Sequence, residues 1–232
     1  NIMELGKKRG IMFRSMSALS PTVEIFTVFT GFKGSRNKKT GNMVQSYILV
    51  ADQQPVDAWQ DGADVAVCGN CPLRYNSKVH TPACYVNKGH DPYMVWHACQ
   101  RGSYIEVGVD VTFEEAIAFI SGYKVRYGAY GDPSAAPHIF GALQSHTGYT
   151  HQWKTSDLEE ECMASVETVY QKRKANEKGW RTYRIVHDAI ELEKDEIMCP
   201  YPTVQCVDCK LCGGAKIPGK NIATLPVQGD HH

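Results

Sequence analysis

The pattern of apolar and polar positions predicts a chain built from short strands and short helices. Runs of β-branched and aromatic residues predict strands over 22–29 and 44–50. The segment 31–41 between them is basic and rich in turn residues. Further along, an Asp-Pro pair predicts the start of a short helix over 91–101.

Helix and strand patterns alternate after residue 112. Thr112 to Glu115 has the capping-box motif, and the apolar spacing behind it predicts a helix that ends at Gly122. Strands are expected over 123–130, 147–153, 162–166 and 180–186, and helices over 134–145, 156–159 and 167–178. One long helix over 157–178 is an alternative that removes the strand at 162–166. Because strands that alternate with helices form βα units, the chain is predicted to be α/β, either a partial βα barrel or a curled, mostly parallel sheet.

The C-terminal end of the sequence is loop-like and rich in cysteine. This change of pattern predicts an α/β domain over 1–198, with a cysteine-bearing loop at 68–86. A cysteine-rich metal-binding segment over 199–232 is expected to pack on that domain.

The charge balance limits the kinds of partner. Lys+Arg and Asp+Glu both number 25 among 232 residues, so the chain lacks the clustered positive charge of a strong nucleic-acid signature. No apolar stretch approaches the ~18 residues that cross a bilayer, and no signal-peptide pattern opens the sequence, so no membrane partner is expected. The partner itself is left open.

Cysteine is the residue type that carries the chemistry. An odd count of nine, with tight C-x-x-C pairs, favours metal binding over disulfides. Seven of the nine fall into two groups. The first cysteine set is Cys68, Cys71 and Cys84, and the second cysteine set is Cys199, Cys206, Cys209 and Cys212.

The second cysteine set has the spacing of an iron–sulfur ligand group. Its C-x2-C-x2-C core is shared with the bacterial ferredoxin run and predicts a [4Fe–4S] cluster. The first cysteine set is one ligand short, so one iron there would have an open coordination position. The alternative is one larger cluster that both sets hold together.

Zinc is the alternative metal. Cys68 and Cys71 with Cys209 and Cys212 would form a zinc ribbon. That site leaves three cysteines unused, whereas iron–sulfur ligation uses all seven, which favours iron.

Other cysteines and histidines are weaker candidates. Cys99 and Cys162 lie on apolar segments and are expected to be core thiols, with Cys99 as an alternative fourth ligand of the first set. His80 and His97 lie near that set in sequence and are expected to be surface or packing histidines.

A second group of candidate residues follows the strand at 123–130. Gly128 and Gly131 would permit close backbone approach by a cofactor, and Arg126 and Asp132 would contact it. Ligands bind at the carboxyl ends of strands in α/β sheets, where His151 and Arg181 are also expected to converge. The alternative for Asp132 is a helix cap in front of a proline at the first helical position.

With these motifs in view, the chain resembles the phage "gene product 88" family. The matching elements are 68–74 (CGNCPLR), 83–87 (ACYVN), 125–133 (VRYGAYGDP), 147–153 (TGYTHQW), 163–165 (MAS), 179–181 (GWR) and 206–213 (CVDCKLCG). The resemblance implies a virus-encoded protein in the cytoplasm of a bacterial host.

The layout is more loosely similar to radical-SAM proteins, with a non-standard cysteine spacing. That similarity implies a reducing cluster on the first cysteine set, with S-adenosylmethionine at its open iron and at the Gly128–Asp132 loop.

Three functions follow as hypotheses. The first is an iron–sulfur protein that acts as a radical-SAM-like enzyme. The second is a zinc-ribbon binding module that uses Lys33, Arg36, Lys38 and Lys39 as its contact loop. The third is an iron–sulfur electron carrier or redox sensor without S-adenosylmethionine chemistry.

Overall fold

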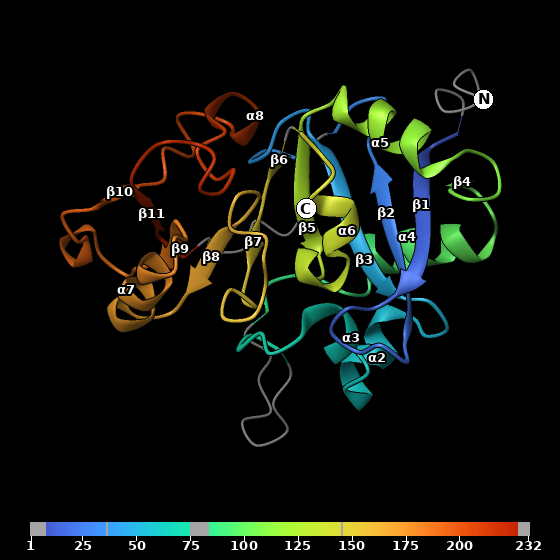
Figure 1. Ribbon diagram of the computed structural model, residues 1–232, viewed down its shortest axis with the longest axis horizontal. Coiled ribbons are helices and arrows are strands. Elements are labelled where there is room, and N and C mark those ends of the chain that lie inside the picture. Colours follow the sequence, from blue (N-terminus) through green and yellow to red (C-terminus); the bar gives the residue numbers. More distant parts are fainter. Residues whose placement is uncertain (1–7, 36, 75–83, 145, 227–232) are drawn as a thin grey trace.

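The computed structural model describes residues 8–35, 37–74, 84–144 and 146–226. In that part of the chain the fold is α/β, as predicted, with two mostly parallel sheets that lie side by side (Figure 1). The first sheet has the strand order β4-β1-β2-β3-β5-β6, and the second has the order β10-β11-β9-β8-β7.

The first sheet is mixed. β1 pairs with β2 and β2 with β3 in antiparallel register, whereas β4, β5 and β6 join their neighbours in parallel. Its strands are β1 (Gly10–Met16), β2 (Glu24–Thr30), β3 (Val44–Val50), β4 (Ile105–Glu106), β5 (Val125–Tyr130) and β6 (His146–Thr147). Every residue of β3 is buried, and the strand was predicted from its β-branched and aromatic content.

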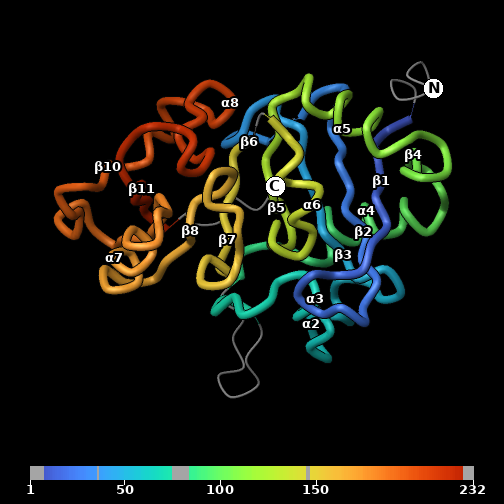
Figure 2. The backbone as a smooth tube through the Cα atoms, viewed as in Figure 1, coloured from blue at the N-terminus to red at the C-terminus, as the bar shows by residue number. Residues whose placement is uncertain are grey.

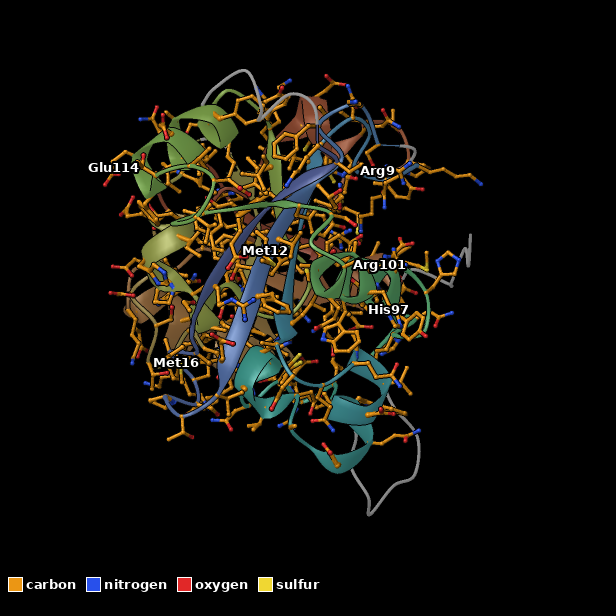
Figure 3. The ribbon with its side chains drawn as sticks, turned by 90° about the vertical axis from the view of Figure 1, so that its right-hand side faces the viewer. Arg9, Met12, Met16, His97, Arg101 and Glu114 are labelled. Carbon is orange, nitrogen blue, oxygen red and sulfur yellow. The ribbon has the colours of Figure 1, made fainter. Side chains whose placement is uncertain are left out.

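Helices cover both faces of the first sheet (Figures 1 and 3). One face carries α4 (Asp91–Gln100), and α2 (Pro55–Asp61) and α3 (Val65–Cys68) also pack against β3. The other face carries α5 (Phe113–Ser121) and α6 (Pro137–Phe140). The predicted capping box at the start of α5 is confirmed: the Glu115 amide donates to the Thr112 hydroxyl at 3.2 Å, and the Thr112 amide donates to the Glu115 carboxylate at 2.9 Å.

The predicted helix over 134–145 is wrong in its extent. The chain forms only the 3₁₀ turn η1 (Pro133–Ala135) and the single turn of α6. Ala136 separates them with φ −137° and ψ 58°. It precedes Pro137, and the proline ring excludes helical backbone at the residue before it.

The second sheet is parallel throughout. Its strands are β7 (Tyr149–Thr150), β8 (Met163–Val166), β9 (Thr182–Ile185), β10 (Glu196–Met198) and β11 (Asn221–Thr224). α7 (Val169–Glu177) packs against β8 and β9. Because β8 is a strand, the alternative of one helix over 157–178 is wrong, and the expected short helix at 156–159 is replaced by turns.

The C-terminal part is less loop-like than the sequence suggested. α8 (Cys206–Cys209) and the short 3₁₀ turn η2 (Ala189–Glu191) are helical, and β11 lies inside the sheet between β9 and β10. The four residues of β11 are too few to show the alternation of apolar and polar positions that marks a strand in a sequence. Burial of all four holds β11 in place.

Gly148 joins the two sheets. It is the single residue between β6, which pairs with β5, and β7, which pairs with β8 (Figure 2). A β-carbon on Gly148 would lie 2.6 Å from the β-carbon of Tyr127, so only glycine fits. The predicted strand over 147–153 is therefore two short strands on either side of a glycine.

The largest apolar core runs through the first sheet and into the second. Beside it, Arg184 and Glu196 form a buried ion pair with 2.7 Å between Nη2 and Oε2. Among the helices in the described part of the chain, none combines the length and the apolar character that a bilayer crossing requires.

Candidate metal centre

The first cysteine set begins where α3 ends. Cys68 is the last residue of that helix, and Gly69 turns the chain with φ 54°. The side chain of Gln152 clamps this turn: its amide nitrogen donates to the Cys68 carbonyl at 3.2 Å, and its oxygen accepts from the Asn70 amide at 3.2 Å. A β-carbon on Gly69 would lie 2.5 Å from the Gln152 side chain, so glycine is required here.

The Cys68 thiol is buried and lies within electrostatic reach of several anionic groups. Burial raises the pKa of the Cys68 thiol well above its usual range, and the neighbouring Cys71 and Cys84 thiols raise it further. The Asp64 carboxylate acts in the same direction and is itself paired with Arg74. The grouping of Cys68, Cys71 and Cys84 around one metal centre stays a prediction.

His151 lies beside the first set, and the sequence reasoning did not propose it as a ligand. Burial lowers the pKa of its imidazole, but the Cys71 thiol and the Glu167 carboxylate outweigh this and raise it to about 10. Nε2 lies 3.4 Å from a Glu167 carboxylate oxygen. This nitrogen is buried and forms no hydrogen bond with the described residues.

Asp132 fixes the backbone around this site. Its carboxylate accepts from the Ser134 amide at 3.0 Å, the Thr150 hydroxyl at 2.6 Å and the His151 amide at 2.9 Å. Its own amide donates to the Val67 carbonyl at 2.6 Å. Asp132 caps η1, as one sequence alternative expected, and it also ties the end of β5 to α3 and β7.

Internal packing accounts for the two glycines that were predicted to approach a cofactor. A β-carbon on Gly128 would lie 2.5 Å from the Gly131 carbonyl oxygen, and one on Gly131 would lie 2.7 Å from the β-carbon of Ile48. Both have positive φ, at 65° and 83°. Their roles in cofactor binding stay predictions.

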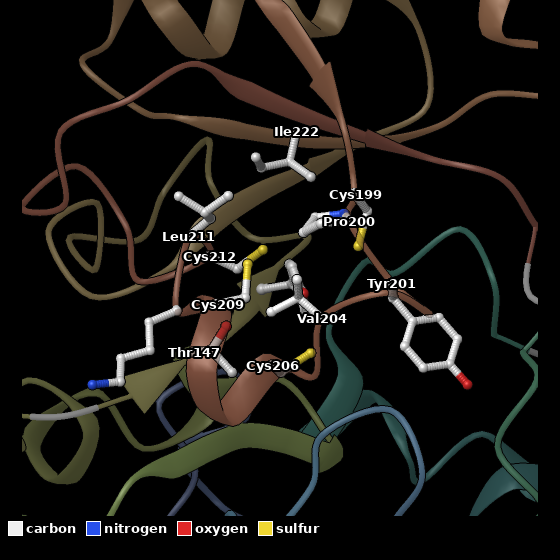
Figure 4. A pocket seen from close by; sticks show the side chains of 12 residues that line it. Thr147, Cys199, Pro200, Tyr201, Val204, Cys206, Cys209, Leu211, Cys212 and Ile222 are labelled. Atoms are coloured by element: carbon white, nitrogen blue, oxygen red, sulfur yellow. The ribbon is translucent and has the colours of Figure 1, made fainter.

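The second cysteine set lines one hollow. Figure 4 shows Cys199, Cys206, Cys209 and Cys212 around this space, which measures about 350 Å³ including the part open to solvent. Pro200, Tyr201 and Val204 from the same segment complete one side. The structure therefore brings all four predicted ligands to one place.

Residues 38–40 hold the helix that carries two cysteines of this set. The Cys206 amide donates to the Lys39 carbonyl at 3.0 Å, and the Val207 amide donates to the Thr40 carbonyl at 3.1 Å. The side chain of Gln205 donates to the Lys38 carbonyl at 2.9 Å. The basic segment proposed as a contact loop thus supports α8 through its backbone. Arg36, the remaining arginine of that loop, lies outside the described residues.

The hollow covers a face of the second sheet. Ile222 from β11 and Tyr149 from β7 point into it from that sheet. Burial raises the pKa of the Cys212 thiol to about 12, and a hydrogen bond from Tyr149 opposes this. The cysteine-rich segment therefore covers this face of the second sheet, as α7 covers the opposite face.

Arg126 contacts Tyr85, and its predicted role in cofactor binding stays a prediction. Its guanidinium donates to the Tyr85 hydroxyl at 3.3 Å and lies close enough to Cys206 to act on the pKa of that thiol. Within the described part of the chain it forms no ion pair. Tyr85 follows Cys84 directly, so the Tyr85–Arg126 contact connects the neighbourhoods of the two sets.

Arg181 also belongs to the second set. Its guanidinium donates to four backbone carbonyls of the segment that carries Cys212: Leu211 at 2.9 Å, Gly214 at 3.2 Å, Ile217 at 2.9 Å and Lys220 at 2.6 Å. Burial lowers its pKa, and the Cys212 thiol opposes that change. The expectation that Arg181 would converge with Asp132 is wrong, because β9 directs it toward the C-terminal segment instead.

The two sets occupy different places. The first lies next to the ends of β5 and β7, whereas the second lines the hollow over the second sheet. The zinc-ribbon alternative drawn from both sets stays a prediction. Among the described residues, no group of three or more His, Cys, Asp and Glu side chains is arranged to hold a single metal ion.

The remaining candidates lie away from these groups. Cys99 and Cys162 are buried core thiols, as expected, and burial raises the pKa of Cys99 to about 12. His97 packs edge-on against Tyr93 at 4.3 Å between ring centres, on α4 (Figure 3). His80 lies outside the described residues.

Comparisons with known proteins gave no further guide: no family model, curated protein or solved structure matches this chain.

Proposed function

We propose that this chain is an iron–sulfur protein whose second cysteine set holds a [4Fe–4S] cluster. The observation that supports it is the arrangement of Cys199, Cys206, Cys209 and Cys212 around one hollow on the second sheet. Four thiols with a C-x2-C-x2-C core are the ligand group that such clusters use. The resemblance to the phage family adds the proposal that the protein works in the cytoplasm of a bacterial host.

The charges around the hollow suit a cluster held by four thiolates. Such a centre carries net negative charge, and Arg126 and Arg181 place two guanidinium groups beside it without a carboxylate partner in the described residues. The Tyr149 hydroxyl donates toward Cys212. Cations and hydrogen bonds at the sulfurs are the means by which a protein stabilises and tunes these centres.

Iron is favoured over zinc by the number of ligands. A zinc site closes with four donors. A zinc ribbon built from both sets would leave three of the seven cysteines without a role, whereas iron–sulfur ligation would use all seven. A cofactor on the first set would supply electron-transfer chemistry, and Cys68, Cys71 and Cys84 are the residues that would hold it.

A radical-SAM-like enzyme is the second candidate. The observation that favours it is the position of the first set beside the carboxyl ends of β5 and β7, where ligands bind in α/β sheets. Addition of S-adenosylmethionine and a reductant tests it. No cofactor cleavage and no change in the cluster spectrum would leave an electron carrier or redox sensor.

The test of the main proposal is purification without oxygen, followed by iron, acid-labile sulfide and zinc analysis. We expect a brown protein with iron and sulfide in equal amounts. Cys206→Ser should lose part of the iron and part of the sulfide. Cys162→Ala, which removes a core thiol, should keep the full content of both. Colourless protein with stoichiometric zinc would overturn the proposal.

A further inference from the structure

Lysines flank α8 beside the hollow of the second cysteine set. Lys210 follows the helix, lines the hollow and is exposed. The Lys39 ammonium lies 5.6 Å from the centre of the Tyr201 ring, and Tyr201 lines the same hollow. Lys38 is exposed, and its carbonyl accepts the 2.9 Å hydrogen bond from Gln205 at the start of α8. The backbone of this basic segment therefore supports the helix, which leaves the lysine side chains available to a partner.

The charge around the hollow is unbalanced. Within the described part of the chain, none of these three lysines forms an ion pair. None of the described residues that line the hollow is acidic, and Asp208, exposed on α8, is the one carboxylate of that helix. The chain as a whole has no net charge. Its positive charge is therefore locally in excess beside the second set, and such an excess attracts anionic partners.

The backbone of Lys210 gives a second, independent sign that its side chain has a role. Among the described residues other than glycine, it is the one with positive φ, at 54°. Glycine is the usual residue where a helix ends in this left-handed conformation, because a β-carbon strains it. The side chain is exposed, so packing does not explain the lysine. A strained residue of this kind points to a function.

An apolar patch lies beside these lysines. Pro200, Tyr201 and Val204 complete one side of the hollow, and Val204 is 36% exposed. Apolar side chains with a charged rim are typical of a surface that binds another protein. Nucleic acid is a poorer match, because three cations neutralise few phosphates and Asp208 would repel them. The surface therefore favours a protein with an acidic face.

We propose that Lys38, Lys39 and Lys210, with the apolar patch, dock an acidic electron-transfer protein. This inference rests on the proposed function, because the centre held by the second set is what the partner would oxidise or reduce. One electron passes between that centre and the redox group of the partner, and no bond is made or broken. Electrostatic steering speeds such encounters about 10–1,000-fold, which gives roughly 2–10-fold for each of three lysines.

The test measures how fast charged oxidants take one electron from the reduced second centre. The full chain, purified without oxygen and reduced, is mixed in a stopped-flow instrument with tris(oxalato)cobaltate(III), a trianion, or tris(phenanthroline)cobalt(III), a trication. One electron passes from the centre to cobalt(III), which becomes cobalt(II), and the visible spectrum follows the reaction. The trianion should react faster at low salt than at high salt, and the trication should not. Polyglutamate, an acidic polypeptide, should block the trianion at low salt.

Variants locate the surface. Lys39→Gln and Lys210→Gln should each slow the trianion roughly 2–10-fold at low salt. Lys178→Gln is the matched control, because it removes the same charge at the end of α7, on the opposite face of the second sheet, and it should react as the unmodified chain. Lys210→Gly separates docking from folding. It should raise the urea midpoint, because glycine adopts positive φ without strain, and still slow the trianion as Lys210→Gln does.

The outcomes separate this inference from the proposed function. An iron–sulfur spectrum with trianion rates that Lys39→Gln and Lys210→Gln leave unchanged would overturn the inference and leave the proposed function standing. Tight binding of a fluorescent DNA duplex that Lys39→Gln abolishes would also overturn it, because it would assign the surface to nucleic acid. Absence of iron and sulfide from the unmodified chain would overturn both.

Discussion

Removal of the Arg181 guanidinium should open the segment that carries Cys212. In Arg181→Met, four carbonyl oxygens between residues 211 and 220 lose a charged donor at 2.6–3.2 Å. Hydrogen bonds to a charged group contribute roughly 1.5–3 kcal/mol each. Relief of the cost of burying an unpaired cation offsets part of this, so we expect a net loss of about 2–4 kcal/mol.

Because Arg181 holds one segment, the loss should be local. Hydrogen exchange of the amides in 211–220 should speed up by roughly 30-fold or more, as about 2 kcal/mol requires. In Arg181→Met purified without oxygen, the iron content should be lower than in the unmodified chain. Arg173→Met is the control, since Arg173 lies on α7 with 67% of its side chain exposed, and it should behave as the unmodified chain. Unchanged exchange in 211–220 of Arg181→Met would show that the four carbonyl contacts do not hold the segment.

Four further predictions test other parts of the structure. Gly148→Ala should lower the free energy of unfolding by about 1–3 kcal/mol in a urea titration, because the new β-carbon would lie 2.6 Å from Tyr127; an unchanged midpoint would contradict this. Cys162→Ala should lower stability by about 1–2 kcal/mol, since the thiol is fully buried, but leave iron content unchanged; loss of iron would make it a ligand. Arg126→Met should make the second centre harder to reduce, which redox titration followed by its visible spectrum measures, and a potential that rises would refute the charge argument. Burial raises the pKa of Glu196, but the ion pair with Arg184 more than reverses this, so the pKa is lowered in the folded protein. The ion pair should therefore stabilise the fold fully above the ordinary pKa of glutamate, and this stabilisation should fade as the pH falls through the lowered pKa. Glu196→Gln should flatten the dependence of the unfolding midpoint on acid pH.

Local signals in the sequence were sufficient for several elements. β3 was predicted with its observed bounds because β-branched and aromatic residues are concentrated in it. The start of α5 was predictable because a capping box is read within four residues. Grouping the second cysteine set needed only spacing, and its four residues line one hollow.

Contacts between distant parts of the chain explain what the sequence did not reveal. The contact that holds the turn after Cys68 comes from far away in the sequence: Gln152, which binds the Cys68 carbonyl, is 84 positions further along. Gly131 was interpreted as a place for a cofactor, and its neighbour proved to be Ile48, from a strand far back in the chain. Arg181 lies on a predicted strand, but its side chain binds carbonyls of the distant segment 211–220, which no local pattern reveals.

The position of β11 also sets an order for folding. β10 pairs only with β11 in the second sheet, and β11 follows it in the chain while lying between it and β9. The residues between them, 199–220, carry all four cysteines of the second set. During synthesis β10 therefore has no partner until this loop has left the ribosome and closed. A cluster that gathers the four thiols would shorten that loop and reduce the entropy cost of closing it, so we expect metal delivery to speed completion of the second sheet as well as to stabilise it.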